Sequence, residues 1–84
     1  TISAILETET GKGKNNEVWK KRIFVIKYED DPYVKEAAVE IWGDLTEHPA
    51  IKLNSEVIAH IDILSKLFEG KYYTTVRVWR LLPK

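Results

Sequence analysis

The chain has 84 residues, no cysteine, and as many acidic as basic side chains, so its formal net charge is zero. This length fits one small domain spanning residues 1–84 and leaves little room for a deep catalytic cleft. Without cysteine there is no disulfide framework, zinc knuckle or cysteine nucleophile, and we expect neither a cofactor nor a bound metal. No apolar run could cross a bilayer, and no signal segment opens the chain. We therefore expect no membrane association and a cytoplasmic location. Since the chain contains no Met, we also expect that its N-terminus has been processed.

The balanced charge is distributed in blocks of opposite sign. Residues 1–11 carry −2, residues 12–27 carry +5, residues 28–62 carry −7 and residues 63–84 carry +4. A fold that brings the two basic segments together would create one basic face on a neutral protein. Whether the chain attracts a polyanion therefore depends on its topology.

The hydrophobic pattern predicts an all-β domain in which extended segments alternate with turn sequences. Five strands are expected, at residues 2–6, 18–28, 36–42, 57–63 and 72–82. Residues 11–16, rich in Gly, Lys and Asn, indicate a flexible loop, while residues 29–32 and 69–71 are typical of turns.

Alternation along the strands predicts which side chains lie on the same side of the sheet. Phe24 and Ile26 are expected to point inward. Residues that should share a side within the other strands are Ile2, Ala4 and Leu6; Ala37, Val39 and Ile41; Val57, Ala59, Ile61 and Ile63; and Val76 and Val78. Trp79 near the C-terminus, and Tyr28 and Tyr33 beside the acidic turn, are expected to have structural roles.

A short helical turn is predicted at residues 43–47, between the third and fourth strands. Asp44 is placed to cap it, with Glu47 three positions later, and Pro49 ends it. Five strands with one helical turn at this place is the order of an oligonucleotide/oligosaccharide-binding (OB) barrel. An SH3-like barrel has a similar periodicity, but the position of the helix and the long first and second strands favour the OB fold.

Two acidic clusters raise the question of metal-assisted hydrolysis: Asp30 with Asp31, and Asp44 with Glu47 and His48. That chemistry needs carboxylates that converge in a pocket. Both clusters are better explained as turn and capping residues, and we therefore expect no enzymatic activity.

Three stretches of the sequence resemble a known family. They read EVWKK at residues 17–21, IWGD at residues 41–44 and EGKYYTTVRVW at residues 69–79. They are similar to a family of small, mostly uncharacterised bacterial OB-fold proteins and, more distantly, to bacterial single-stranded DNA-binding proteins (SSBs). The resemblance implies base-stacking aromatics at Trp42, before Gly43, and at Phe68 on the last hairpin. Partner recruitment and assembly do not transfer, because the acidic SSB tail is missing and SSBs usually have a longer last hairpin.

In an OB barrel the ligand crosses the second and third strands, between the first loop and the last hairpin, and the two basic blocks fall on these elements. Lys and Arg displace counterions from phosphates, and aromatic rings stack on unpaired bases. The expected single-stranded-DNA-binding residues are Lys12, Lys14, Trp19, Lys20, Lys21, Trp42, Lys66, Phe68, Lys71, Tyr72 and Arg77. Phe68 and Tyr72 are alternatives for one stacking position, and a cross-strand ion pair, for instance with Asp62, is an alternative role for Arg77.

The sequence thus predicts a sequence-tolerant single-stranded DNA-binding protein for replication, recombination or repair. RNA stays open as a ligand, because stacking and phosphate contacts do not exclude it. The alternative from another class is a protein-interaction or assembly module, in which the same exposed aromatics form a subunit interface. Since one OB domain offers a short binding site, an SSB-like role favours a homo-oligomer.

Overall fold

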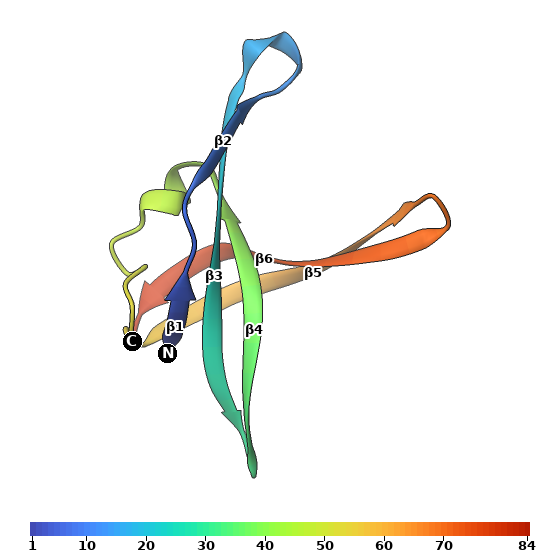
Figure 1. Ribbon diagram of the computed structural model, residues 1–84. Coiled ribbons are helices and arrows are strands. Elements are labelled where there is room, and N and C mark those ends of the chain that lie inside the picture. The colour runs from blue at the N-terminus through green and yellow to red at the C-terminus, as the bar shows by residue number, and fades with distance from the viewer.

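The structure, a computed structural model, describes residues 1–84 and confirms the all-β class (Figure 1). Its elements in chain order are β1 (Ile2–Ile5), β2 (Glu9–Lys12), η1 (Lys14–Asn16), β3 (Val18–Asp30), β4 (Tyr33–Trp42), η2 (Gly43–Glu47), β5 (Val57–Phe68) and β6 (Lys71–Pro83). The strand count is six rather than five, because residues 6–8 interrupt the expected first strand and separate β1 from β2.

The strands form one open sheet in the order β1-β3-β4-β6-β5, with β2 paired to the first residues of β3. Neighbouring strands are antiparallel except β4 and β6, which run parallel. The two ends of this order approach each other just before β5. Ile2 N–H donates to Ser55 O at 2.9 Å, and Asn54 N–H donates to Ile2 O at 2.8 Å. The sheet therefore curls around a core instead of lying flat.

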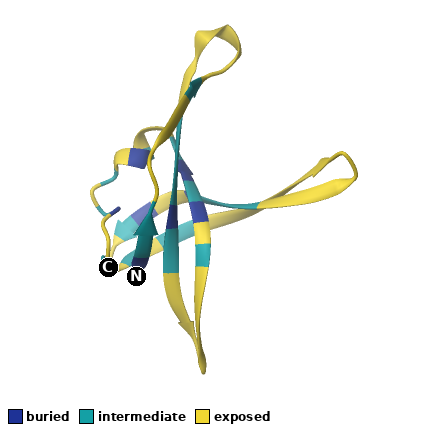
Figure 2. Ribbon diagram, in the orientation of Figure 1, coloured by how far each residue is buried: buried dark blue, intermediate teal, exposed yellow.

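The core lies on the inner side of the curled sheet. Figure 2 marks the buried segments of the strands in dark blue. It consists of seven buried side chains: Ile2, Phe24, Val39, Ile41, Ile51, Val78 and Leu81. β3 and β4 each supply every second residue to it, because alternate side chains of a strand point to the same side. The expected inward facing of Phe24 is confirmed, and Ile26 packs against the core as a partly buried neighbour.

β1 departs from the expected alternation. Its pairing with β3 is irregular between Ile2 and Ala4, so that Ile2 and Ile5 pack on the core. Leu6, which the alternation placed with Ile2, is 48% exposed. A bulge of this kind shifts the following side chains to the other side, and the period of two read from the sequence does not reveal it.

The far end of β5 and the start of β6 project from the sheet as a two-stranded arm, residues 61–77 (Figure 1). A bulge marks the root of this arm: His60 pairs with Arg80 and Ile61 pairs with Val78, which leaves Trp79 as an extra residue in β6. Figure 2 shows the arm exposed along most of its length.

Residues that the sequence suggested as structural are more exposed than expected. Ile61 and Ile63 follow Val57 and Ala59 on β5 but lie on the arm, outside the core. Trp79 is 53% exposed, with its ring 5.2 Å from that of His60.

β3 and β4 are both longer than expected at the turn that joins them: β3 continues to Asp30, and β4 begins at Tyr33. Tyr28 and Tyr33, beside the turn, are 46% and 67% exposed. Their expected structural role therefore does not include packing into the core.

The predicted helical turn is present as η2, a 3-10 helix. Asp44 does not cap it: Trp42 is the N-cap residue and makes no side-chain capping hydrogen bond. The buried Thr46 hydroxyl donates to Gly43 O at 2.8 Å. Arg22 Nη1 donates to Thr46 O at 3.2 Å and so ties η2 to β3. No helix in the structure is long and apolar enough to span a membrane.

Candidate nucleic-acid interface

The side of β3, β4 and β6 that faces away from the core carries most of the candidate residues. Lys21 of β3 pairs with Trp42 of β4, and Glu40 of β4 pairs with Arg77 of β6. Trp19 lies two residues before Lys21, hence on the same side. Paired residues of neighbouring strands point to the same side of a sheet, so the register alone brings five side chains from three strands onto one surface, the Trp42 cluster: Trp19, Lys21, Glu40, Trp42 and Arg77.

The two cations of this cluster lie over the half-buried indole of Trp42. Arg77 Cζ is 5.2 Å and Lys21 Nζ is 5.8 Å from the ring centroid, within the range of cation–π attraction. The ring of Trp19 is tilted by 51° to that of Trp42, with centroids 5.7 Å apart. Two aromatic rings and two cations thus form one contiguous surface.

Glu40 holds the cluster together. The Glu40 side chain is 14% exposed; its Oε1 accepts a 2.8 Å hydrogen bond from Trp42 Nε1 and lies 3.3 Å from Arg77 Nη2. The ion pair expected as an alternative for Arg77 therefore exists, but with Glu40 and not with Asp62. Glu40 was missed as a site residue, although its spacing of two from Trp42 already placed both on one strand face.

Trp19 lies flat against Gly11, its partner in the pairing of β2 with β3. A Cβ atom at Gly11 would come within 2.4 Å of the indole, so only glycine leaves room for the ring. Gly11 is part of β2 and does not belong to the flexible loop expected there. The glycine sets the depth at which Trp19 sits beside Trp42.

Two shallow hollows border the Trp42 cluster. One, of ≈ 270 Å³, opens between Trp42, Arg77 and the arm residues Lys66 and Tyr73. The other, of ≈ 410 Å³, lies beside Trp19, Trp42 and Gly43. Gly43 has φ +69° and no atom within 4 Å of where a Cβ would be, so the backbone there is open to solvent.

The arm extends this surface on one of its two sides. Pairing of Lys66 with Tyr73 and of Phe68 with Lys71 places these four side chains on the same side of the ribbon. Tyr72 pairs with Leu67 and points to the opposite side. Of the two alternatives for a stacking position, Phe68 therefore continues the surface of the Trp42 cluster and Tyr72 does not.

Three lysines of the first basic block are not brought into the cluster. Lys20 alternates with Lys21, points toward η2, and lies 3.5 Å from Glu47. Lys12 and Lys14 lie at the end of the β2–β3 hairpin, which projects away from the arm (Figure 1).

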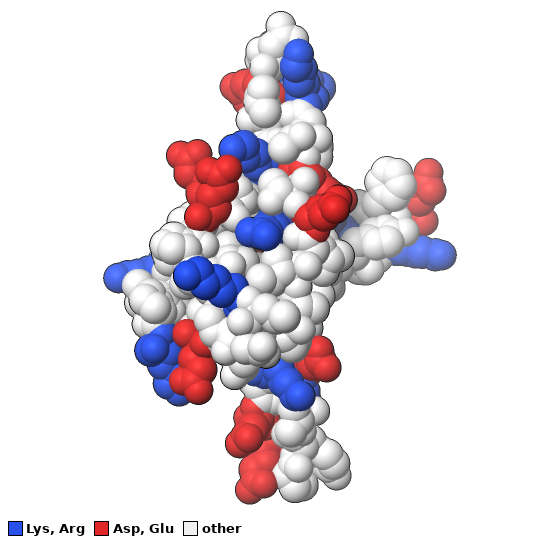
Figure 3. All heavy atoms as spheres, turned by 60° about the vertical axis from the view of Figure 1, so that its left-hand side comes forward, with Lys and Arg blue, Asp and Glu red and all other residues white.

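The positive charge is less concentrated than the charge blocks suggested. Lys21 Nζ lies 3.3 Å from Glu9, in addition to the pairs that Arg77 and Lys20 form. On the side of the molecule shown in Figure 3, acidic and basic side chains are interspersed. The candidate surface is thus basic and aromatic, with carboxylates already paired to its cations.

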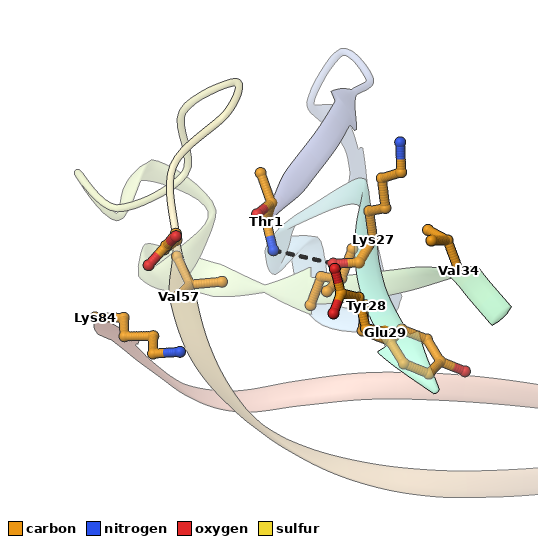
Figure 4. Close-up of a pocket in the computed structure, with 9 residues that line it drawn as sticks. Thr1, Lys27, Tyr28, Glu29, Val34, Val57 and Lys84 are labelled. Carbon is orange, nitrogen blue, oxygen red and sulfur yellow. Dashed lines mark hydrogen bonds between the residues drawn. The ribbon is translucent and has the colours of Figure 1, made fainter. Parts of the chain in front are cut away.

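The largest hollow, of ≈ 580 Å³, lies elsewhere, between the two chain ends and the middle of the β3–β4 hairpin (Figure 4). The amino group of Thr1 donates to Lys27 O at 3.0 Å across it, and Lys84 forms part of its wall. It contains no residue of the expected site.

The second acidic cluster has a local role. His48 Nδ1 accepts a hydrogen bond from the backbone N–H of Ala50 at 3.0 Å, which shapes the turn after η2. Glu47 pairs with Lys20. The His48 contact fits the expected turn chemistry, whereas the ion pair of Glu47 reaches β3 and is not the capping contact expected of it.

A family model described as a domain of unknown function, DUF3127, matches residues 1–82 of the chain. No curated protein and no solved structure matches it.

Proposed function

The chain belongs to the DUF3127 family, whose description assigns no activity, and from its surface chemistry we propose that it binds single-stranded DNA without sequence preference. A role in replication, recombination or repair is part of this proposal. The observation that carries it is the Trp42 cluster: two tryptophans and two cations on the outer surface of the sheet.

We propose an OB barrel as the finer description of the open sheet. β1 and β2 both pair with β3 and count as two halves of one bent strand, which restores five strands. β6 lies between β4 and β5 in the sheet, so the chain does not follow a simple meander, and this supports a Greek-key barrel. In such a barrel the ligand side is the outer surface of β3 and β4, where the Trp42 cluster lies.

Binding proceeds by exchange of ionic partners. A phosphate that reaches Arg77 or Lys21 takes the place of Glu40 or Glu9, and the counterions of the nucleic acid are released. Lys66, beside the same hollow, forms none of the ion pairs in the structure and is free for a further phosphate. Unpaired bases then stack on the tryptophan rings, which is sequence-tolerant because every base has a π face.

The test is a titration of a labelled oligothymidylate of about 12 nucleotides, within the usual reach of one OB domain, followed by fluorescence anisotropy. Three phosphate contacts predict a slope of log affinity against log salt of about −2. Trp42→Ala is expected to lower the affinity by about 1–3 kcal/mol, the value of one stacked base. The matched control is Trp79→Ala. Trp79 is exposed, but its ring lies beside His60 and not beside the tryptophans of the Trp42 cluster.

Unfolding of each variant is measured in parallel. If Trp42→Ala loses the roughly 3–5 kcal/mol typical of a core aromatic, or binds oligothymidylate like the parent, Trp42 is not a stacking platform. A flat salt response contradicts the whole proposal. Tighter binding of an oligouridylate of equal length assigns the surface to RNA instead.

A further inference from the structure

The two sides of the arm differ in chemistry. One side carries the basic and aromatic residues that continue the Trp42 cluster. The other side holds no charged residue at all; it consists of Ile61, Ile63, Ser65 and Leu67 from β5 and Tyr72, Thr74 and Val76 from β6. We call these seven residues the apolar stripe.

Six of the seven residues of the stripe lie open to solvent, while Val76, at the root of the arm, is half-buried against the core. Ile63 is 69%, Leu67 61% and Tyr72 74% exposed. A contiguous apolar patch of a few hundred Å² on a monomeric protein is often a binding site. Two of the three polar side chains on the stripe, Ser65 and Thr74, hydrogen-bond to each other at 3.1 Å, so they can be buried without leaving their hydroxyls unpaired. The third is Tyr72, whose hydroxyl stands at the end of a largely apolar ring.

The arm also lacks support from the rest of the sheet. β6 pairs with β4 only at Arg77 and Val78, and from there to the turn β5 and β6 pair only with each other. A two-stranded ribbon on its own is marginally stable in water. A partner that covers the stripe would supply the apolar burial that the ribbon lacks.

We propose that the apolar stripe is a dimer interface, packed against the same stripe of a second copy of this chain. A two-fold interface places the same surface patch on both subunits, and an uncharged stripe fits itself without any like-charge repulsion. The stripe exposes on the order of 500 Å² per copy, approaching the roughly 800 Å² per partner of a standard interface. We therefore expect a reversible dimer of moderate affinity.

Nucleic acid is a poorer occupant for this side. Phosphates require Lys or Arg, and none lies on the stripe, whereas Lys66, Lys71 and Arg77 all lie on the opposite side. Dimerisation through the stripe would leave the Trp42 cluster of each copy open. The inference goes beyond the proposed function and does not depend on it.

The first experiment is sedimentation equilibrium of the full chain between about 1 and 100 µM, a range that detects a dimer with a dissociation free energy of about 6–8 kcal/mol. The mass is expected to rise from monomer to dimer over this range. Ile63→Lys should weaken dimerisation at least tenfold, because it places two like charges in the interface. The matched control, Leu64→Lys, changes the neighbouring residue on the other side of the ribbon and should leave dimerisation unchanged.

The second experiment uses the absence of cysteine from the chain. Ser65→Cys lies in the middle of the stripe and is nearly isosteric, so mild oxidation should cross-link it into a covalent dimer. Lys66→Cys points to the other side and should cross-link far more slowly. Circular dichroism confirms that each variant is folded before it is compared.

Three results would overturn the interface. The parent could remain monomeric over the whole range; the two lysine variants could dimerise equally; or both cysteine variants could cross-link at the same rate. A loss of oligothymidylate binding in Ile63→Lys without any change of mass would instead assign the stripe to nucleic acid. Failure of DNA binding in every variant would count against the proposed function and leave the dimer test unaffected.

Discussion

The inner and outer sides of β3 and β4 are made of alternate residues of the same two strands, yet they do different things. Phe24 and Ile41 point inward and are fully buried. Lys21 and Trp42, each one to three residues away, point outward and hold the candidate site. A substitution at an inward-facing residue should therefore lower stability, whereas a substitution at the neighbouring outward-facing residue should lower binding. Pairs of variants at adjacent positions test this separation.

The largest effect is expected inside the sheet. Phe24→Ala removes a fully buried ring at the centre of the core and should lower the free energy of unfolding by about 3–5 kcal/mol. Val25→Ala, one residue on and on the outer side, should cost far less. Chemical denaturation of both variants measures the difference, and equal losses would mean that the two sides are not energetically distinct.

A smaller effect, on binding, is expected at Gly11. Gly11→Ala forces the Trp19 ring away, since the new Cβ would lie 2.4 Å from it. We expect a loss of up to about 1–3 kcal/mol of oligothymidylate affinity if Trp19 stacks on a base, with little loss of stability. Gly13→Ala is the control, because its nearest neighbour, Glu17 O, would be 3.8 Å away. Unchanged binding in Gly11→Ala would remove Trp19 from the site.

The smallest effect is expected for two adjacent lysines. Lys21→Ala should reduce the salt slope of binding by about 0.7, the contribution of one phosphate contact on a single strand. Lys20→Ala should leave the slope unchanged, since Lys20 points toward η2 and pairs with Glu47. Anisotropy titrations at several salt concentrations compare the two, and thermal melts should show both variants as stable as the parent. The same slope for both lysines would refute the assignment of sides.

The sequence was sufficient for the features that depend on local pattern. Alternation in β3 and β4 correctly placed Phe24, Val39 and Ile41 on one side and Trp42 on the other. The turn residues Glu69 and Gly70 correctly located the last hairpin, and both have positive φ. These features depend on neighbours within a few residues, which a single sequence contains.

The features that the sequence did not reveal depend on contacts between distant segments. The bulge in β1 put Ile5 in the core where alternation favoured Leu6. Charge blocks suggested free cations, but Glu9 and Glu40 come from other strands to pair with Lys21 and Arg77. Strand register decides such pairs, and it could not be known before the strands were placed side by side.

The extra residue at the root of the arm offers a way to change the direction in which the arm points. Because Trp79 is the unpaired residue of a bulge, its removal would leave the pairing of His60 with Arg80 and of Ile61 with Val78 in place. A bulge bends its strand and increases its twist, so the deletion would alter the direction in which the arm points and not its hydrogen bonds. Deletion of a single codon would thus change the direction of the arm relative to Trp42 without altering any residue of the Trp42 cluster. In the proposed dimer, it would change the length of single-stranded DNA that the two copies span.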